Sequence, residues 1–252
     1  MKILVQRLDY AYDGFRLDID SLGFAGGRVT SIVGPNGAGK STFLKCAASV
    51  LPLDRGCLFV DERDLAALGG RERARLIGYV PQEPAFSFNY EVRDYVVMGR
   101  AAFLSVFSSP SPHDVRMAEE ALHYVGLEGC SRRPFLELSS GERRLVLIAR
   151  ALAQEPEILL LDEPTSFLDP RHEVRIMRLC RRLAGEMGKT LIVTLHSLEM
   201  AAKYSDAIVF MKAGRVVAFG PPGEILTEGL LRDVYDLEMR IVDCAGQKFF
   251  VK

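Results

Sequence analysis

The fold is decided by one stretch of the sequence, Gly34-Pro35-Asn36-Gly37-Ala38-Gly39-Lys40-Ser41. It fits the pattern G-x-x-x-x-G-K-[ST], follows a β-rich segment at Val29–Val33, and opens an expected helix at Ser41–Val50. Glycines in such a loop let backbone N–H groups curl around a phosphate, and the helix N-terminus adds a positive dipole. A plain glycine turn is the alternative, but the position between strand and helix favours a phosphate site.

Two side chains of this loop carry its charge chemistry. Lys40 can neutralise β- and γ-phosphate oxygens, and the hydroxyl of Ser41 can ligate Mg²⁺. We therefore predict that the loop, together with the next residue Thr42, binds a nucleotide with Mg²⁺.

A pair of acidic residues follows a second apolar strand. Ile158–Leu161 reads as a buried strand, and Asp162 and Glu163 stand directly after it. The strand end beside the phosphate loop is where an open α/β sheet keeps its ligands. We expect Asp162 to hold Mg²⁺ and Glu163 to polarise the attacking water as a general base. The alternative is a strand end followed by acidic surface residues without a catalytic role.

Length and composition describe an ordinary globular chain. Its 252 residues are 48% hydrophobic, and 32 Lys and Arg against 33 Asp and Glu give a net charge of -1. Without a bulk positive field, sequence-independent nucleic-acid binding is not expected. The longest apolar runs, Ile158–Leu161 and Ala207–Met211, are far below the ~20 residues that span a bilayer. The N-terminal apolar run is too short for a signal peptide, so we expect a cytosolic chain. Its five cysteines are spaced like structural thiols.

Hydrophobic patterning divides the chain into unequal parts. The first thirty residues alternate loosely and predict short antiparallel strands joined by turns. Further apolar runs predict strands of a sheet buried on both faces, namely Cys57–Val60, Ile77–Val80, Ile158–Leu161, Thr190–Leu195 and Ala207–Met211. We expect one domain over 1–252, with a nucleotide-binding core at 1–89 and 146–222. A helical insertion at 90–145 carries expected helices at Glu91–Met98, Asp114–Val125 and Glu142–Ala153. The tail at 223–252 reads as one helix, Glu224–Tyr235, and a hairpin around Ala245-Gly246.

The segment Leu138-Ser139-Ser140-Gly141-Glu142 makes the family resemblance specific. It is similar to the L-S-G-G-Q signature of ATP-binding cassette proteins. The other ordered motifs of that superfamily can also be matched, in Tyr12, Gln82, Ser166-Phe167-Leu168-Asp169 and His196. The resemblance implies a P-loop NTPase (RecA-like) α/β core, with an N-terminal antiparallel β subdomain and an inserted helical subdomain.

The resemblance also implies a role for each matched residue. Tyr12 looks like the aromatic that stacks on adenine, Gln82 like the glutamine that senses Mg²⁺ and water, and His196 like the histidine that contacts the γ-phosphate. With Lys40 and Glu163, Gln82 and His196 make up the expected catalytic set; Ser41, Gln82 and Asp162 make up the expected metal set. Ser139 and Gly141 would donate to ATP held by a second copy, and Asp169 would lie at the same nucleotide. A head-to-tail dimer is therefore implied.

Three positions depart from the family pattern. Ser140 stands where the signature has a second glycine, Glu142 where it has glutamine, and Phe167 where a small residue is common.

The distance along the chain between two of these motifs excludes some branches of the superfamily. Leu138 follows Gln82 by only 56 positions, which leaves no room for the long coiled coils of chromosome or repair ATPases. Small-molecule kinases would not need the signature. The segment from Phe88 to Arg100 resembles the ATPases of importers for ferric siderophores, haem and cobalamin. Phe86 and Phe88 are candidate anchors for a permease helix or part of a subdomain core.

The prediction that follows is an ATP-hydrolysing motor subunit of an importer for a metal chelate (ferric siderophore, haem or cobalamin), at the cytoplasmic face of the cell membrane. Its implied partners are integral-membrane permease subunits, a second copy of itself and, indirectly, an extracytoplasmic substrate-binding protein, with no nucleic acid. A soluble regulatory ATPase of the same superfamily, not coupled to transport, is the alternative.

Overall fold

The strand that leads into the glycine loop lies inside a six-stranded sheet. The computed structural model describes residues 1–82, 89–105, 108–244 and 247–251. The strands of this sheet are β3 (Val29–Val33), β6 (Ile77–Val80), β7 (Ile158–Leu161), β8 (Thr190–Thr194), β9 (Ala207–Lys212) and β10 (Arg215–Gly220). Their order is β10-β9-β3-β8-β7-β6, and only β10 runs antiparallel to its neighbour. Every residue of β3, β7 and β8 is buried, as expected for a sheet covered on both faces.

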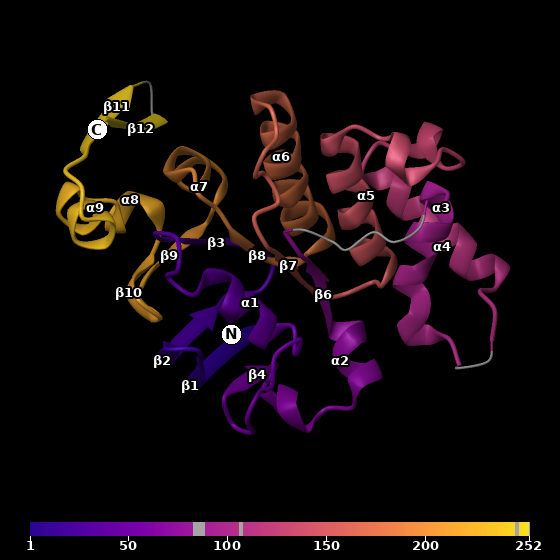
Figure 1. Ribbon diagram of the computed structural model, residues 1–252, viewed down its shortest axis with the longest axis horizontal. Coiled ribbons are helices and arrows are strands. Elements are labelled where there is room, and N and C mark those ends of the chain that lie inside the picture. Colours follow the sequence, from indigo (N-terminus) through magenta and orange to yellow (C-terminus); the bar gives the residue numbers. More distant parts are fainter. Residues whose placement is uncertain (83–88, 106–107, 245–246, 252) are drawn as a thin grey trace.

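A second sheet is antiparallel and lies beside the first (Figure 1). Its strands are β1 (Ile3–Tyr12), β2 (Phe15–Phe24), β4 (Leu58–Val60) and β5 (Arg63–Asp64), in the order β2-β1-β4-β5. The expectation that Cys57–Val60 joins the parallel sheet was wrong. Leu58 and Val60 instead pair with β1 and bury their side chains in the core beneath it, because β1 offers its free edge and its apolar face there.

Helices cover both faces of the parallel sheet. The described helices are α1 (Lys40–Ala47), α2 (Gly70–Leu76), α3 (Val92–Val97), α4 (Pro112–Tyr124), α5 (Ser140–Ala153), α6 (Pro170–Met187), α7 (Leu198–Tyr204), α8 (Pro222–Ile225) and α9 (Glu228–Tyr235). Of these, α1 packs on one face of the sheet, and α5, α6 and α7 pack on the other. Alternate residues of the strands enter two separate cores. Leu160 and Ile192 pack with α1 and the antiparallel sheet, whereas Leu161 and Val193 pack with α5, α6 and α7. The glycine loop follows β3 and therefore lies at the carboxyl ends of the parallel strands.

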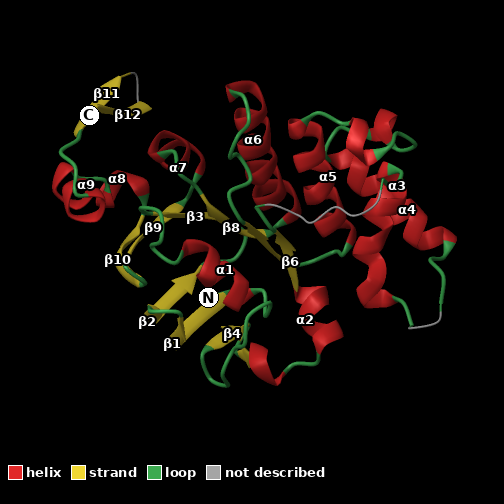
Figure 2. Ribbon diagram, viewed as in Figure 1, coloured by secondary structure: helices red, strands yellow, loops and turns green. Residues whose placement is uncertain are grey.

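The chain between β6 and β7 is mainly helical and lies at one side of the molecule (Figures 1 and 2). It contains α3, α4, α5 and the short 3-10 helices Met98–Phe103, Glu128–Cys130 and Phe135–Glu137. Tyr95 and Phe135 pack with ring centroids 5.0 Å apart in its core. A further 3-10 helix, Leu65–Ala67, precedes α2.

An ion cluster centred on a buried arginine joins elements within this helical segment. The Arg100 side chain is only 3% exposed and donates from Nε to Asp114 Oδ1 at 3.1 Å. Its Nη1 donates to the carbonyl of Ala153 at 2.7 Å and to Glu155 Oε2 at 2.6 Å. The guanidinium also lies over the ring of Phe103, 3.8 Å from the centroid. One cation therefore holds the start of α4 and the end of α5 together.

The C-terminal tail departs from the sequence expectation. One helix was expected over Glu224–Tyr235, but the chain forms α8 and α9 with a break between them. Leu226 is extended (ψ 95°), and the Thr227 side chain caps the second helix by accepting from the N–H of Leu230. The expected hairpin is present as β11 (Arg240–Cys244) and β12 (Gln247–Val251); its turn, Ala245-Gly246, lies outside the described residues.

Within the described residues, the helices are all too short or too polar to cross a membrane.

Candidate active site

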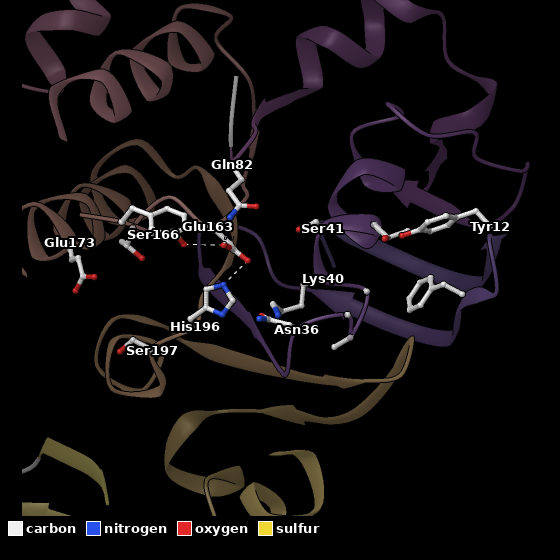
Figure 3. Close-up of a pocket in the computed structure, with 17 residues that line it drawn as sticks. Tyr12, Asn36, Lys40, Ser41, Gln82, Glu163, Ser166, Glu173, His196 and Ser197 are labelled. Carbon is white, nitrogen blue, oxygen red and sulfur yellow. Dashed lines mark hydrogen bonds and ion pairs between the residues drawn. The ribbon is translucent and has the colours of Figure 1, made fainter. Parts of the chain in front are cut away.

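A pocket of about 930 Å³ opens where the carboxyl ends of the parallel strands meet the start of α1. It is lined by residues of the glycine loop and of the loops that follow β6, β7 and β8 (Figure 3), namely Asn36, Gly37, Ala38, Gly39, Lys40, Ser41, Thr42, Gln82, Glu163, Thr165, Ser166, Phe167, Glu173, His196 and Ser197, with Tyr12 and Phe15 from the antiparallel sheet. Most of the predicted nucleotide-site residues therefore converge on one cavity. Gly34 and Pro35 form the backbone behind it.

Glycine is required in the loop for two physical reasons. Gly37 and Gly39 have φ of +77° and +98°, which side chains rarely adopt. A Cβ at Gly34 would lie 2.1 Å from the carbonyl oxygen of Met211, and one at Gly39 would lie 2.8 Å from the Phe15 ring. Among the described residues no side chain caps α1, which begins at the pocket. Its first N–H groups therefore suit an anionic ligand.

Lys40 is folded back into the loop. Its ammonium is buried and donates to the carbonyls of Gly34 at 2.9 Å and Pro35 at 3.0 Å. Burial lowers the pKa of Lys40, while the negative charges of Glu163 and Asp162 oppose that shift. The cation thus lies in the cradle where phosphate oxygens are expected, paired with carbonyls rather than with a carboxylate.

Asp162 is buried behind the pocket and accepts three hydrogen bonds. Ser41 Oγ donates to Oδ1 at 2.9 Å, Thr194 Oγ1 donates to the same oxygen at 2.8 Å, and Tyr79 OH donates to Oδ2 at 3.3 Å. Burial, followed by the charge of Asp162, raises the pKa of Tyr79, so its hydroxyl stays a donor. A hydroxyl and a carboxylate side by side are the hard oxygen ligands that Mg²⁺ prefers. The donor set fits the predicted cation.

Glu163 brings the other expected catalytic residues together. Gln82 Nε2 donates to Oε2 at 2.6 Å, and His196 Nε2 lies 2.7 Å from Oε1. Ser166 Oγ also donates to Oε2 at 3.0 Å (Figure 3). Glu163 is nearly buried and has φ +46°, a strained value for a residue with a side chain. The carboxylate is therefore fixed in direction and faces the pocket.

Thr194 and Tyr79 were missed by the sequence analysis. Thr194 Oγ1 accepts from the backbone N–H of Glu163 at 2.7 Å while donating to Asp162, so one hydroxyl joins both carboxylate residues. No motif marks these positions. The signal lies in the strand register, since Val80 pairs with Leu161 and Leu161 pairs with Val193.

The aromatic end of the pocket lies opposite the acidic end (Figure 3). Tyr12 is half exposed at the end of β1, and its ring centroid lies 5.6 Å from that of Phe15. Phe15 also lines the pocket and was not predicted. The available signal was a pair of aromatics flanking the Asp13-Gly14 turn. The flat apolar faces of these two rings suit stacking against a nucleobase.

Ser139, Gly141 and Asp169 do not line this pocket. Ser139 caps α5 in a reciprocal box with Glu142, whose pKa is lowered by the N–H of Ser139. Asp169 caps α6 and accepts from His172, with 2.6 Å between Oδ2 and Nδ1, and this contact lowers the pKa of Asp169. The His172 ring packs on Gly141, where an added Cβ would lie 2.1 Å from Cδ2. Ser139 and Asp169 are exposed outside the pocket, whereas Gly141 is buried beneath the His172 ring.

Comparison with known proteins agrees with this geometry. Residues 17–166 match the ABC transporter family. A hemin import ATP-binding protein HmuV of Thermobifida fusca is 41% identical over 226 residues, which cover 90% of this chain and 78% of the relative. A solved metal-chelate type ABC transporter in an inward-facing conformation is 30% identical with a TM-score of 0.86, over 99% of this chain and 96% of the other. A bacterial ABC transporter cassette solved as a dimer is 26% identical with a TM-score of 0.74, over 87% and 98%. The chain thus belongs to the ABC transporter family, as an ATP-hydrolysing subunit.

Proposed function

We propose that this chain is the motor of an importer for a metal chelate, of the haem and siderophore kind, working at the cytoplasmic face of the membrane. The observation that carries the proposal is the convergence of Lys40, Gln82, Glu163 and His196 on one pocket of a cassette whose relatives include a hemin import protein. The cargo itself is inferred from that likeness and from the metal-chelate transporter.

The proposed chemistry is hydrolysis of ATP bound with its phosphates on the glycine loop. Lys40 exchanges its carbonyl partners for phosphate oxygens, and Tyr12 stacks on the adenine. Ser41, Asp162 and Gln82 would hold Mg²⁺, which would supply positive charge to the phosphate oxygens. Glu163 takes the proton from the attacking water.

His196 positions Glu163 and reaches the γ-phosphate in this scheme. It lies on the far side of the carboxylate from Gln82, with one of these residues at each oxygen. The two contacts hold the base in one direction before ATP arrives.

The proposed working form is a head-to-tail dimer. Ser139, Gly141 and Asp169 lie outside the pocket of their own chain, which is the placement needed if they serve ATP on a second copy. We also propose the division inferred from sequence, with a core at 1–89 and 146–222, a helical subdomain at 90–145 and a tail at 223–252.

A groove of about 360 Å³ is the proposed permease site. It lies between β6 and the helical segment and is lined in part by Tyr79, Pro81, Tyr95 and Met98. Gln82 follows this groove directly in the chain, so a bound permease would reach the catalytic glutamine. Phe86 and Phe88, the anchors considered from sequence, lie outside the described residues.

The test is association with a membrane partner. Natively expressed protein should sediment with membranes and co-purify with a polytopic permease. Vesicles that contain both chains should take up haem or a ferric siderophore only when ATP is supplied on the side of the membrane where the motor is bound. An extracytoplasmic binding protein should increase that uptake. Lys40→Ala serves as the control without transport. Recovery of soluble partners alone, with normal ATPase activity, would favour the regulatory ATPase instead.

A further inference from the structure

A second cavity, of about 920 Å³, lies between α6 and the helical segment and is similar in volume to the nucleotide pocket. Most of its lining comes from one face of α6, and Ser139 and Glu142 complete it from the start of α5. Among the described residues, none lines both cavities. This second cavity, called the arginine groove below, is therefore a separate candidate site.

Four arginines form a row along the groove. They stand three or four residues apart on α6, line the groove and are all exposed, namely Arg171, Arg175, Arg178 and Arg182. Side chains at this spacing are neighbours on a helix, with Cβ atoms about 5–6 Å apart. The row therefore repels itself unless anions lie between its members.

Carboxylates of the described chain leave most of this charge unbalanced. Arg182 forms an ion pair with Glu186 at 3.7 Å. Among the described residues, neither Arg171 nor Arg178 has such a partner on α6 or on its neighbours. The groove therefore carries an excess of positive charge although the chain as a whole has a net charge of -1.

The acid at the edge of the groove does not remove that excess. Glu142 accepts from the N–H of Ser139 at 2.9 Å and lies 3.5 Å from Arg133, which does not line the groove. Its charge is thus already shared with another cation.

Arg175 is held by neutral groups. Its Nη2 donates to the carbonyls of Val125 and Gly126, both at 3.0 Å, just after the end of α4. These contacts use one nitrogen of the guanidinium and leave Nε and Nη1 for a ligand. An anion on Arg175 is therefore joined through one side chain to the helical segment.

The lining favours phosphate groups over other anionic partners. Guanidinium groups match phosphate oxygens in pairs of parallel hydrogen bonds. His172 supplies the only ring among the described lining residues, and it packs on Gly141, so the bases of a nucleic acid would find no stacking surface. The walls are helices, which offer no strand edge to an extended acidic peptide.

We propose that the arginine groove binds a soluble anion with two or more phosphate groups, held by Arg171, Arg175 and Arg178. The ligand contacts α6 directly and the helical segment through Arg175. This inference goes beyond the proposed function, because it depends on neither the cargo nor the permease.

The first experiment titrates inorganic tripolyphosphate by calorimetry, without Mg²⁺, into the Lys40→Ala chain, where binding at the glycine loop is weakened. Adding Arg175→Gln and Arg178→Gln should lower the affinity for tripolyphosphate by roughly 10²-fold, because two charge-assisted contacts are lost. The matched control combines Arg55→Gln with Arg71→Gln, which removes the same charge from exposed residues before β4 and on α2. The control should bind within about threefold of its background.

Each other outcome overturns the proposal. Equal losses in the two double variants would show a general effect of net charge, and absence of binding to Lys40→Ala itself would remove the site. Binding of poly-glutamate but not tripolyphosphate would assign the groove to an acidic peptide. If the double variant does not fold, Arg178→Gln alone should still weaken binding about tenfold. Phosphate release from ATP, measured on the parent chain, tests the proposed function separately.

The second experiment locates the ligand on the unaltered chain. Phenylglyoxal modifies exposed guanidinium groups, and mass spectrometry of the peptides gives the rate at each arginine. Tripolyphosphate should slow modification of Arg171 and Arg178 several-fold and leave the rates at Arg55 and Arg71 unchanged. An unchanged rate at Arg178, in a chain that calorimetry shows to bind tripolyphosphate, would place the ligand elsewhere and contradict the proposal.

Discussion

Two buried polar networks of this chain differ in how their charges are balanced. Around Arg100 one buried guanidinium contacts the buried carboxylate of Asp114 and the half-exposed carboxylate of Glu155, so each carboxylate has a cationic partner. Around Asp162 and Glu163 the donors are mainly neutral hydroxyl and amide groups, and the nearby ammonium of Lys40 is bonded to carbonyls instead. The first network is complete by itself. The second keeps negative charge available for a ligand cation, which is the arrangement of a site rather than of a structural clamp.

This difference predicts opposite phenotypes for the two networks. Changes in the acidic network should lower turnover with little effect on folding. Changes in the Arg100 network should lower stability with little effect on turnover.

Glu163→Gln should give the largest effect. The side chain keeps its size and loses its basicity, so turnover should fall by roughly 10² to 10⁴ while ATP and Mg²⁺ still bind. Loss of a negative charge beside triphosphate should favour an ATP-bound dimer, measurable by phosphate release and size-exclusion chromatography. Near-normal turnover would show that another group is the base.

Lys40→Ala should come next, acting on binding rather than on the chemical step. Removal of the charge that faces the phosphates should weaken ATP binding by roughly 10²-fold, measured by calorimetry. Lys45→Ala is the matched control, since Lys45 lies exposed on the same helix. An affinity within threefold of the parent would contradict the phosphate-loop assignment.

The network around Asp162 and Glu163 also shows which parts of the site could be predicted from the sequence. The glycine loop, Asp162 and Glu163 were identifiable because their motif residues are contiguous and stand at a strand–helix or strand–loop boundary. Thr194 and Tyr79 were not, because their contacts with Asp162 depend on the order β6-β7-β8, which no local pattern encodes. The same limit explains β4: an apolar run predicts a strand without naming the sheet it joins.

Thr194→Val should lower turnover about tenfold and raise the Mg²⁺ concentration needed for half-maximal activity, because Asp162 and the N–H of Glu163 both lose a partner. Thr194→Ser should restore both quantities. Thr190→Val is the control on the same strand, where the hydroxyl accepts from Gly27 instead. Equal effects of the two valine variants would indicate a general loss of packing rather than a role in the site.

Arg100→Met should leave turnover within about threefold at temperatures where the chain is folded. It should lower the free energy of unfolding by about 3–5 kcal/mol, because Asp114 remains as a buried charge without its cation. Denaturant unfolding measures this change. Combining Arg100→Met with Asp114→Asn should recover part of the loss, and no recovery would argue that packing over Phe103 dominates.

The smallest predicted effect is on how the free energy of unfolding depends on acidic pH. Hydrogen bonds from Ser111, then from Arg100, lower the pKa of Asp114 to about 2 from its ordinary 3.8. A lowered carboxyl pKa in the folded chain stabilises it fully above pH 3.8, and this contribution is lost as the pH falls toward 2. Asp114→Asn should therefore flatten the fall of unfolding free energy over that range. An unchanged slope would assign the acid sensitivity to other carboxylates.

The position of the helical segment has a consequence for how the chain folds. The chain leaves the sheet at Val80 and returns at Ile158, yet β6 and β7 are neighbouring parallel strands. Their pairing must close a long loop, which slows folding unless the intervening chain becomes compact first. Because α3, α4 and α5 pack on one another around Phe135, local collapse of that segment would bring the two strands within reach. Edge strand β6 should then be among the last parts of the sheet to acquire protection from hydrogen exchange during refolding.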